Sequence, residues 1–248
     1  TINHDNNDYE VCIVDTEMSS DYCYSADTIQ KRMKWNPAGD VLLITGVKHE
    51  SEQVFIVIAN RATQAFQEYP WPYTPDGFSA NAIDWSPDGT KFALSHNGLV
   101  YIYDYPGMTE VTSFPHRTEA YSSMEWDSTG TRIATKGDSF FGKCRVFIWD
   151  IQSGQLVHTI EPPDDACIYD MAWSPGGEFL VVTLEDDGIQ FIDATTFEHL
   201  KAIETPDEIV NDYGEFAFGT VTFTQDGRFL SIENSKLREL YIIPWGFF

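Results

Sequence analysis

An internal repeat constrains this chain more than any other feature of its sequence. An aromatic residue, three further residues, a glycine, two residues and an apolar residue recur in that order five times. The copies are Trp35-Gly39-Leu42, Trp85-Gly89-Phe92, Trp126-Gly130-Ile133, Trp173-Gly177-Leu180 and Phe223-Gly227-Leu230. Successive aromatics are 50, 41, 47 and 50 residues apart. This period is typical of a supersecondary unit that stacks on copies of itself.

Each copy carries the signals of a β-hairpin. In the segment NAIDWSPDGTKFALS (81–95), apolar and polar residues alternate on both sides of a Pro-Asp-Gly turn, and the glycine stands where a positive φ is needed. A second strand pattern follows at the same period: VCIVD (11–15), VFIVI (54–58), VYIYD (100–104), VFIWD (146–150), IQFID (189–193) and LYIIP (240–244). A more polar strand follows several of these patterns, as in GQLVHTIE and FEHLKAIE. Such strands are suited to a solvent-exposed outer edge.

The repeats predict an all-β chain, a β-propeller of four-stranded blades with strands a to d running outward from the axis. We expect strands c and d of a first blade, four complete blades, and strands a, b and c of a last one. Residues 1–248 then form a single propeller domain, incomplete at the N-terminus and part of a six- or seven-bladed ring. A five-bladed ring closed by residues 11–15 is the alternative.

In these motifs the sequence resembles the WD40-repeat family over residues 11–248. The resemblance is carried by VFIWD ending at Asp150, by its variants VYIYD and IQFID, and by the hairpins WSPDG (85–89) and WSPGG (173–177). It implies a WD40 propeller that acts as a non-catalytic interaction scaffold in a larger complex. The chain lacks the Gly-His dipeptide of many such repeats, with only His116 near that place. The buried His–Asp network of the family is therefore expected to be largely absent or replaced.

A narrower resemblance is to the WD40 subunits of the THO messenger-RNA export complex. Its residues are Tyr105-Pro106, Trp149-Asp150 and the terminal Tyr241-Ile242-Ile243-Pro244. It implies a role in mRNA processing or export.

Composition removes several classes of function. The chain has 39 acidic and 15 basic residues, a formal net charge of -24, and no basic run longer than Lys31-Arg32. Nucleic acid and anionic membranes are therefore disfavoured, and a partner with a basic surface is favoured. No apolar stretch reaches the roughly 20 residues of a membrane helix, and residues 1–5 do not resemble a signal peptide.

The four cysteines, Cys12, Cys23, Cys144 and Cys167, form no CxxC pair. This spacing predicts a reducing compartment, cytoplasm or nucleus, although it is compatible with one disulfide.

The sequence shows no catalytic or metal-binding constellation. The GxSxG, Walker, GxGxxG and HExxH motifs are all missing, so we predict no enzyme activity, no cofactor and no small-molecule ligand. His158 and His199 fall on expected outer strands, and His49 and His96 fall near b–c turns, so no metal site is predicted. The acidic segments 164–165 and 185–187 are interpreted as solvated turns. Trp35, Trp85, Trp126 and Trp173 are interpreted as core anchors.

Three aromatic insertions predict a protein interface. They lie at 69–78, 138–143 and 212–218, in d–a and b–c connections that emerge on the same face of a propeller. Exposed aromatics on rigid loops commonly anchor interfaces. The candidate interface residues are the aromatics Trp71, Tyr73, Phe140, Phe141, Tyr213 and Phe216, with the rim acids Glu161, Asp164 and Asp165. The alternative is that the aromatics fold back over the central channel as plugs.

Two further hypotheses stay open at this point. One is a module that recognises a basic peptide, such as a histone tail, at the channel mouth. The other is a propeller that gates a hydrolase located elsewhere in a longer chain.

Overall fold

A computed structural model describes most of the chain. The described residues are 9–14, 21–26, 28–48, 54–70, 82–115, 123–137, 144–162, 166–184, 188–203, 218–224, 226–234 and 239–244. They contain 21 regular elements, and all of these are strands, which confirms the predicted all-β class. Within these ranges no helix is long and apolar enough to cross a membrane.

The chain divides into two compact units, Thr1–Val111 and Thr112–Phe248. We describe each unit by itself, and the extent of a single propeller domain stays a prediction.

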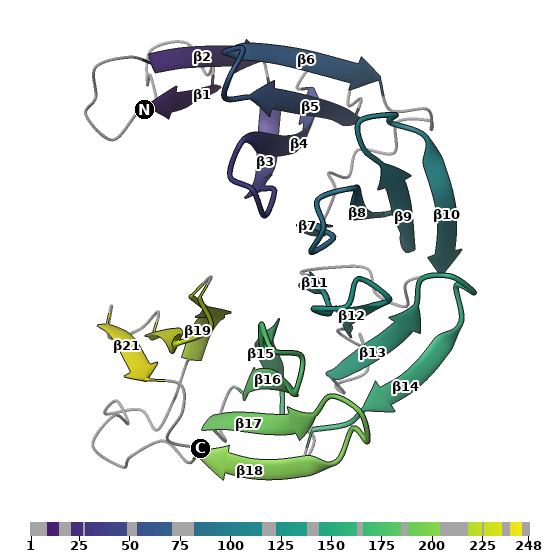
Figure 1. The fold of residues 1–248 in the computed structure, drawn as a ribbon, viewed down its shortest axis with the longest axis vertical. Coiled ribbons are helices and arrows are strands. Elements are labelled where there is room, and N and C mark those ends of the chain that lie inside the picture. Colours follow the sequence, from purple (N-terminus) through teal and green to yellow (C-terminus); the bar gives the residue numbers. More distant parts are fainter. Residues whose placement is uncertain are drawn as a thin grey trace. The chain divides into compact units, whose positions relative to one another are not determined.

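Unit 1 contains antiparallel sheets whose strands follow chain order (Figure 1). Sheet 1 has two strands, β1 (Tyr9–Val14) and β2 (Asp21–Ala26). Sheet 2 has four, β3 (Thr28–Trp35), β4 (Val41–Lys48), β5 (Val54–Asn60) and β6 (Ala65–Pro70). Sheet 3 consists of β7 (Ala82–Trp85), β8 (Lys91–His96), β9 (Leu99–Asp104) and β10 (Glu110–Pro115), the last of which continues past the unit boundary.

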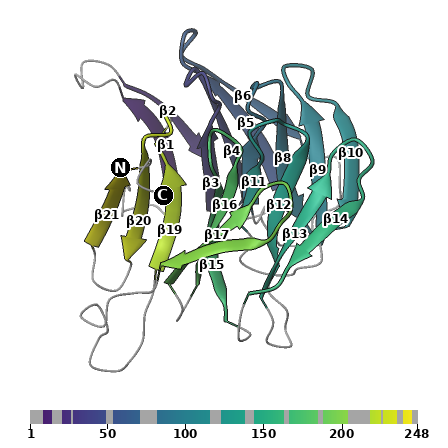
Figure 2. The ribbon, with the colours of Figure 1, turned by 60° about the horizontal axis from the view of Figure 1, so that its bottom comes forward.

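Unit 2 repeats this arrangement. Sheet 4 consists of β11 (Met124–Trp126), β12 (Arg132–Gly137), β13 (Arg145–Asp150) and β14 (Leu156–Ile160). Sheet 5 consists of β15 (Ile168–Trp173), β16 (Phe179–Leu184), β17 (Gly188–Asp193) and β18 (His199–Ile203). Sheet 6 has three strands in the described residues, β19 (Phe218–Phe223), β20 (Phe229–Asn234) and β21 (Glu239–Pro244), which lie side by side in Figure 2. The predicted order of two, four times four, and three strands is confirmed; ring closure and blade number stay predictions.

The five hairpins share one turn geometry. The glycines of the repeat, Gly39, Gly89, Gly130, Gly177 and Gly227, all have φ between 67 and 81°. Each glycine N–H donates to the carbonyl three residues earlier at 2.8–3.0 Å. A side chain with a β-carbon is disfavoured at such φ values, so the position of glycine in the repeat follows from the turn.

A polar residue directly after each aromatic closes the same hairpin. These residues are Asn36, Ser86, Asp127, Ser174 and Thr224, and the oxygen of each side chain accepts the backbone N–H five residues later at 3.0–3.1 Å, or 2.9 Å for Ser86. The turn therefore satisfies a backbone donor that the hairpin ladder leaves unpaired.

Aspartates close the turns that follow the third strands. Asp104, Asp150 and Asp193 each accept backbone N–H bonds from their own turn, at 2.9, 2.7 and 2.7 Å. Hydrogen bonds to the ionised form lower the pKa of all three carboxyls. This explains the aspartate at the end of three of the four strand patterns that have one; the fourth, Asp15, lies outside the described residues.

Asp226 carries the most strongly shifted carboxyl of a hairpin turn. The Thr224 hydroxyl donates to it at 2.7 Å, and Arg228 adds its backbone N–H at 3.1 Å and its Nε at 2.6 Å. These bonds lower the pKa of Asp226 to about 2.

We expect a pH titration of the Asp226 carboxyl carbon by NMR to give a pKa near 2. In T224V the pKa should move toward the ordinary value of about 3.9. Because the folded pKa is lowered, the stabilising contribution of Asp226 is complete above about pH 4 and is lost as the pH falls through 2. An unchanged pKa in T224V would contradict this assignment of the cause.

Two repeat tryptophans dock their inner strand onto the preceding sheet of the same unit. Trp85 Nε1 donates to the Lys34 carbonyl at 3.0 Å, and Trp173 Nε1 donates to the Glu125 carbonyl at 3.3 Å. Trp85, Trp126 and Trp173 are 4–5% exposed, as predicted for core anchors.

Trp35 corrects the prediction, because it is 40% exposed. The residue two positions before it, Met33, is 52% exposed, whereas its counterparts Ile83, Met124, Met171 and Val221 are buried. The physical reason is that sheet 1, which precedes sheet 2, contributes only β1 and β2 in the described residues. No inner strand among its described residues covers this face of β3.

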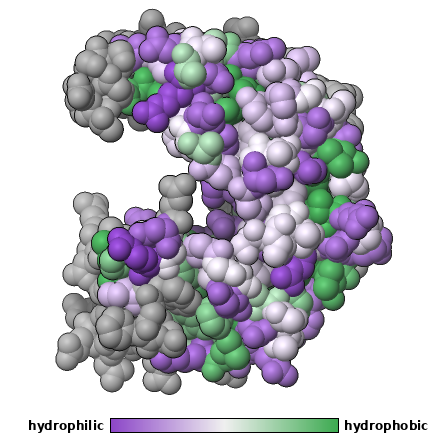
Figure 3. All heavy atoms as spheres, viewed as in Figure 1, coloured by the Kyte–Doolittle hydropathy of each residue, from purple (hydrophilic) through white to green (hydrophobic). Residues whose placement is uncertain are grey.

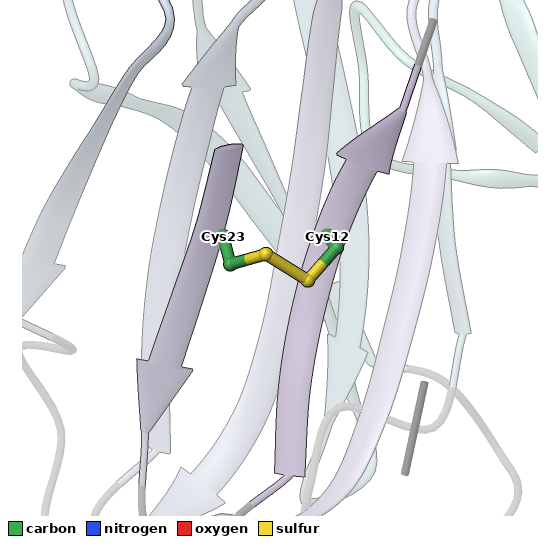
Figure 4. Close-up of a disulfide and its surroundings, with 2 residues drawn as sticks. All are labelled: Cys12 and Cys23. Carbon is green, nitrogen blue, oxygen red and sulfur yellow. A yellow bond between two sulfur atoms is a disulfide. The ribbon is translucent and has the colours of Figure 1, made fainter. Parts of the chain in front are cut away.

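Sheet 1 packs on sheet 2 through its side chains and contains a disulfide. Val11 shares a buried cluster with Leu42 and Phe55, and the Tyr24 hydroxyl donates to Glu68 of β6 at 2.8 Å. Cys12 and Cys23 are directly opposed in the β1–β2 register and are joined by a disulfide (Figure 4). The sequence left one disulfide open, and Cys12 and Cys23 form it; the cellular compartment stays a prediction.

Hydroxyls on the second strands bond to neighbouring strands, whereas the fate of the family's His–Asp network stays a prediction. Thr135 accepts the Trp149 Nε1–H at 2.9 Å, which links β12 to β13. In the neighbouring repeats Ser95 accepts the N–H of Ala82 at 2.9 Å and Thr183 accepts the N–H of Asp170 at 3.1 Å. In these two repeats a hydroxyl of the second strand is thus tied to the backbone of the first strand. His116 lies outside the described residues.

Candidate partner-binding surface

Most of the predicted interface lies outside the described residues. This holds for Trp71, Tyr73, Phe140, Phe141, Tyr213, Phe216, Asp164 and Asp165, whose role stays a prediction. Glu161 is described: it directly follows β14, its side chain is 62% exposed, and Arg145 Nη2 contacts its Oε1 at 3.0 Å.

Glu161 borders a hollow that we name the β18 hollow. It has a volume of about 460 Å³ and is lined by Glu161, Gln190, His199, Leu200, Lys201 and Ala202. The last four residues belong to β18, the outer strand of sheet 5. Gln190 lies on β17 directly opposite Ala202. The hollow therefore joins the end of sheet 4 to the outer two strands of sheet 5.

Gln190 is the unusual member of this hollow. It is 7% exposed, and its Oε1 atom has no hydrogen-bond partner. A buried carbonyl oxygen without a partner costs free energy, because it has lost its hydrogen bonds to water. A donor from a bound molecule would satisfy this acceptor once the Gln190 side chain turns into the hollow.

The edge of β18 adds a second feature. It is the last strand of its sheet, so in the described part of the chain no further strand pairs with its outer edge. Such an edge accepts an extended segment by backbone hydrogen bonding. Leu200 is 51% exposed there and supplies an apolar contact.

The two sheets that form the hollow are fixed to each other by polar contacts. Lys136 Nζ donates to the Tyr169 carbonyl at 3.1 Å, and Ser123 Oγ donates to Asp170 at 2.8 Å. The second carboxylate oxygen of Asp170 accepts the N–H of Val221 at 3.0 Å, which extends the link to sheet 6. A surface on rigid elements is suited to binding with little ordering cost.

No cluster suited to a metal ion is present among the described residues, and hydrophobic groups are scattered over the face seen in Figure 3. Among the described residues no three His, Cys, Asp or Glu side chains gather in a way that suits a metal ion. His158 instead stacks on Phe197 at 4.7 Å. In the view of Figure 3 the apolar groups form separate areas among hydrophilic ones.

The sequence-based prediction named Glu161, whose role stays a prediction, and did not name Gln190. Gln190 stands at the third position of the strand GIQFID, where the neighbouring residues are buried and apolar. A polar residue inside a buried third strand is the signal that could have revealed it.

The strand order and the hairpins are those of a β-propeller fold, and part of the chain is similar to a WD40 domain. A family model described as the anaphase-promoting complex subunit 4 WD40 domain matches residues 141–213.

Two known proteins are similar in sequence. One is a subunit of eukaryotic translation initiation factor 3 from Aedes aegypti, which is 24% identical over 157 residues, covering 60% of this chain and 22% of that protein. WD repeat-containing protein AAC3 from Dictyostelium discoideum is 23% identical over 154 residues, covering 54% and 32%. The matches thus span about a fifth to a third of these relatives. Neither relative belongs by its name to the THO complex, so the narrower resemblance stays a prediction.

Solved structures support the fold. The β-propeller domain of Cps50 (Swd1) from Myceliophteria thermophila aligns with a TM-score of 0.66 at 16% identity, covering 89% of this chain and 66% of that one. Kuenenia stuttgartiensis hydrazine synthase aligns with a TM-score of 0.71 at 16% identity, covering 95% and 70%. At this identity both similarities show the fold alone, whatever activity the names carry.

Proposed function

We propose that this chain is a non-catalytic interaction scaffold that binds an extended, basic segment of a protein partner along the β18 hollow. The single observation that carries the proposal is the buried, unpartnered Oε1 of Gln190 beside the outer edge of β18. The segment would pair its backbone with that edge and donate a hydrogen bond from a lysine or arginine to Gln190.

Charge supports a basic partner. The formal net charge of -24 attracts cationic segments over a distance of about a Debye length, 8–10 Å at physiological salt. Within the hollow, Glu161 has one oxygen on Arg145 and remains 62% exposed. Lys201 and His199 also line the hollow, and the positive charge of Lys201 would repel a peptide with a long run of lysine or arginine. A complex that acts in mRNA export is a further part of the proposal and rests only on the sequence resemblance.

A peptide-binding measurement tests the site. We expect a fluorescent peptide that alternates lysine and valine to bind the chain, and a matched glutamate–valine peptide not to bind. Q190L should weaken the affinity about tenfold, since the acceptor is lost. E161K should slow association and reduce its dependence on salt.

The matched control is V157T, an exposed outer-strand position of sheet 4, which should leave the affinity unchanged. Equal binding of both peptides, or an affinity that Q190L leaves unchanged, would overturn the proposed site.

A further inference from the structure

Two thiols meet at the boundary between sheets 4 and 5. The Sγ atoms of Cys144 and Cys167 are 2.7 Å apart, and neither cysteine is part of a disulfide. Cys144 directly precedes β13, and Cys167 directly precedes β15. Cys144 is 5% exposed, whereas Cys167 is half-buried. One thiol is thus shielded from solvent, and the other is accessible.

The flanking core fixes this approach. Val146 and Ile168, which are 0% and 2% exposed, belong to the same buried cluster as Cys144, and Cys167 packs against that cluster. Both cysteine backbones are therefore held by core residues on adjacent sheets. Two cysteines form a bridge without backbone movement only when their side chains already face each other, and a sulfur contact of 2.7 Å meets this condition.

We propose that Cys144 and Cys167 are a modification site, a thiol pair that closes to a second disulfide and covalently ties sheet 4 to sheet 5. The oxidant is a low-molecular-weight disulfide such as oxidised glutathione. This modification is independent of whether the β18 hollow binds a peptide.

The reaction proceeds in two exchanges. The accessible Cys167 loses its proton and its thiolate attacks one sulfur of the oxidant; a mixed disulfide forms and the first reduced thiolate leaves. The Cys144 thiolate then attacks the Cys167 sulfur, the intramolecular disulfide forms and the second reduced thiolate leaves. The two protein thiols lose two electrons, the oxidant gains them, and the two released protons end on the reduced small thiols.

The closed bridge should stabilise unit 2. It joins positions 23 residues apart, and a loop of this size predicts a rise of about 5–10 °C in the melting temperature, which dithiothreitol reverses.

Peptide mapping of the full chain tests the pair directly. After incubation with oxidised glutathione we expect a linked peptide that joins Cys144 to Cys167 and disappears on reduction. The Cys12–Cys23 bridge serves as the internal reference for complete digestion. A chain in which both cysteines are still alkylated as thiols, or in which Cys144 or Cys167 is linked to Cys12 or Cys23, would overturn the proposal.

Two single variants test the order of attack. C144S should accumulate one glutathione on Cys167, because the second exchange is removed. C167S should stay largely unmodified, because Cys144 is shielded. C144A and C167A repeat the comparison with an apolar replacement if the serine variants unfold. The assigned order would be contradicted if oxidised glutathione reacted with Cys144 in C167S or C167A as fast as it reacts with Cys167 in C144S or C144A.

Discussion

Replacing Trp173 with alanine is expected to lower the free energy of unfolding of unit 2 by about 3–5 kcal/mol, the usual range for a large aromatic residue in a core. Trp173 is 5% exposed, belongs to the cluster that joins sheets 4 and 5, and donates its Nε1–H to the Glu125 carbonyl. The Cζ atom of the Arg132 guanidinium lies 5.4 Å from the centroid of the Trp173 ring. The variant therefore leaves a cavity, loses the hydrogen bond to the Glu125 carbonyl and loses one of the two aromatic rings next to Arg132, the other being Phe197 at 5.5 Å. Urea denaturation followed by circular dichroism measures the change.

Trp35 provides the matched control. It stands at the same place in the repeat but is 40% exposed, so W35A should cost about 1 kcal/mol or less. W173F keeps an aromatic ring at this place, and the fifth copy of the repeat has phenylalanine there, Phe223. We therefore expect W173F to lower the free energy of unfolding by less than W173A does. Equal losses in W35A and W173A would show that the packing of the repeat aromatics does not depend on the preceding sheet.

The sequence predicted the strands well because each repeat combines several local signals. The glycine needs a positive φ, the aromatic and the later apolar residue share one face, and the period is long enough for four strands. Even the outer strands that contain His158 and His199 were placed correctly. Local chemistry and spacing suffice for such features, since hairpin partners are close in sequence.

Features that depend on contacts between sheets could not be predicted in the same way. The exposure of Trp35 follows from what precedes sheet 2. Within sheet 1, the disulfide of Cys12 and Cys23 follows from the β1–β2 register, which the sequence alone does not fix. The Cys144–Cys167 contact and the β18 hollow each combine residues from two sheets. Sequence periodicity places a residue on a face but does not say which side chain meets it there.

Replacing Asp127 with alanine is expected to lower the free energy of unfolding by about 3–5 kcal/mol, as for breaking a buried ion pair. Asp127 is 1% exposed. Its Oδ1 accepts the N–H groups of Thr131 and Arg132 at 3.0 Å each, and its Oδ2 accepts Arg132 Nε at 3.0 Å. Arg132 in turn donates to the Ala194 carbonyl of the next sheet at 2.8 Å. Alanine therefore leaves two backbone donors and a partly buried cation unpaired.

A set of variants separates the turn from the ion pair at Asp127. D127N keeps an oxygen for the two backbone N–H groups, as Asn36 does in sheet 2, and should cost only about 1–3 kcal/mol because it loses the charge. R132M removes the cation but retains an unbranched apolar stem. The double variant D127A/R132M should then lose about 1–3 kcal/mol less than the sum of the single losses, since no unpaired cation remains. Denaturant unfolding of all four variants measures these differences. Additive losses would mean that the Asp127–Arg132 ion pair contributes nothing to stability beyond the backbone hydrogen bonds of the turn. The contact of Arg132 with Ala194 would then hold the two sheets together without help from the carboxylate.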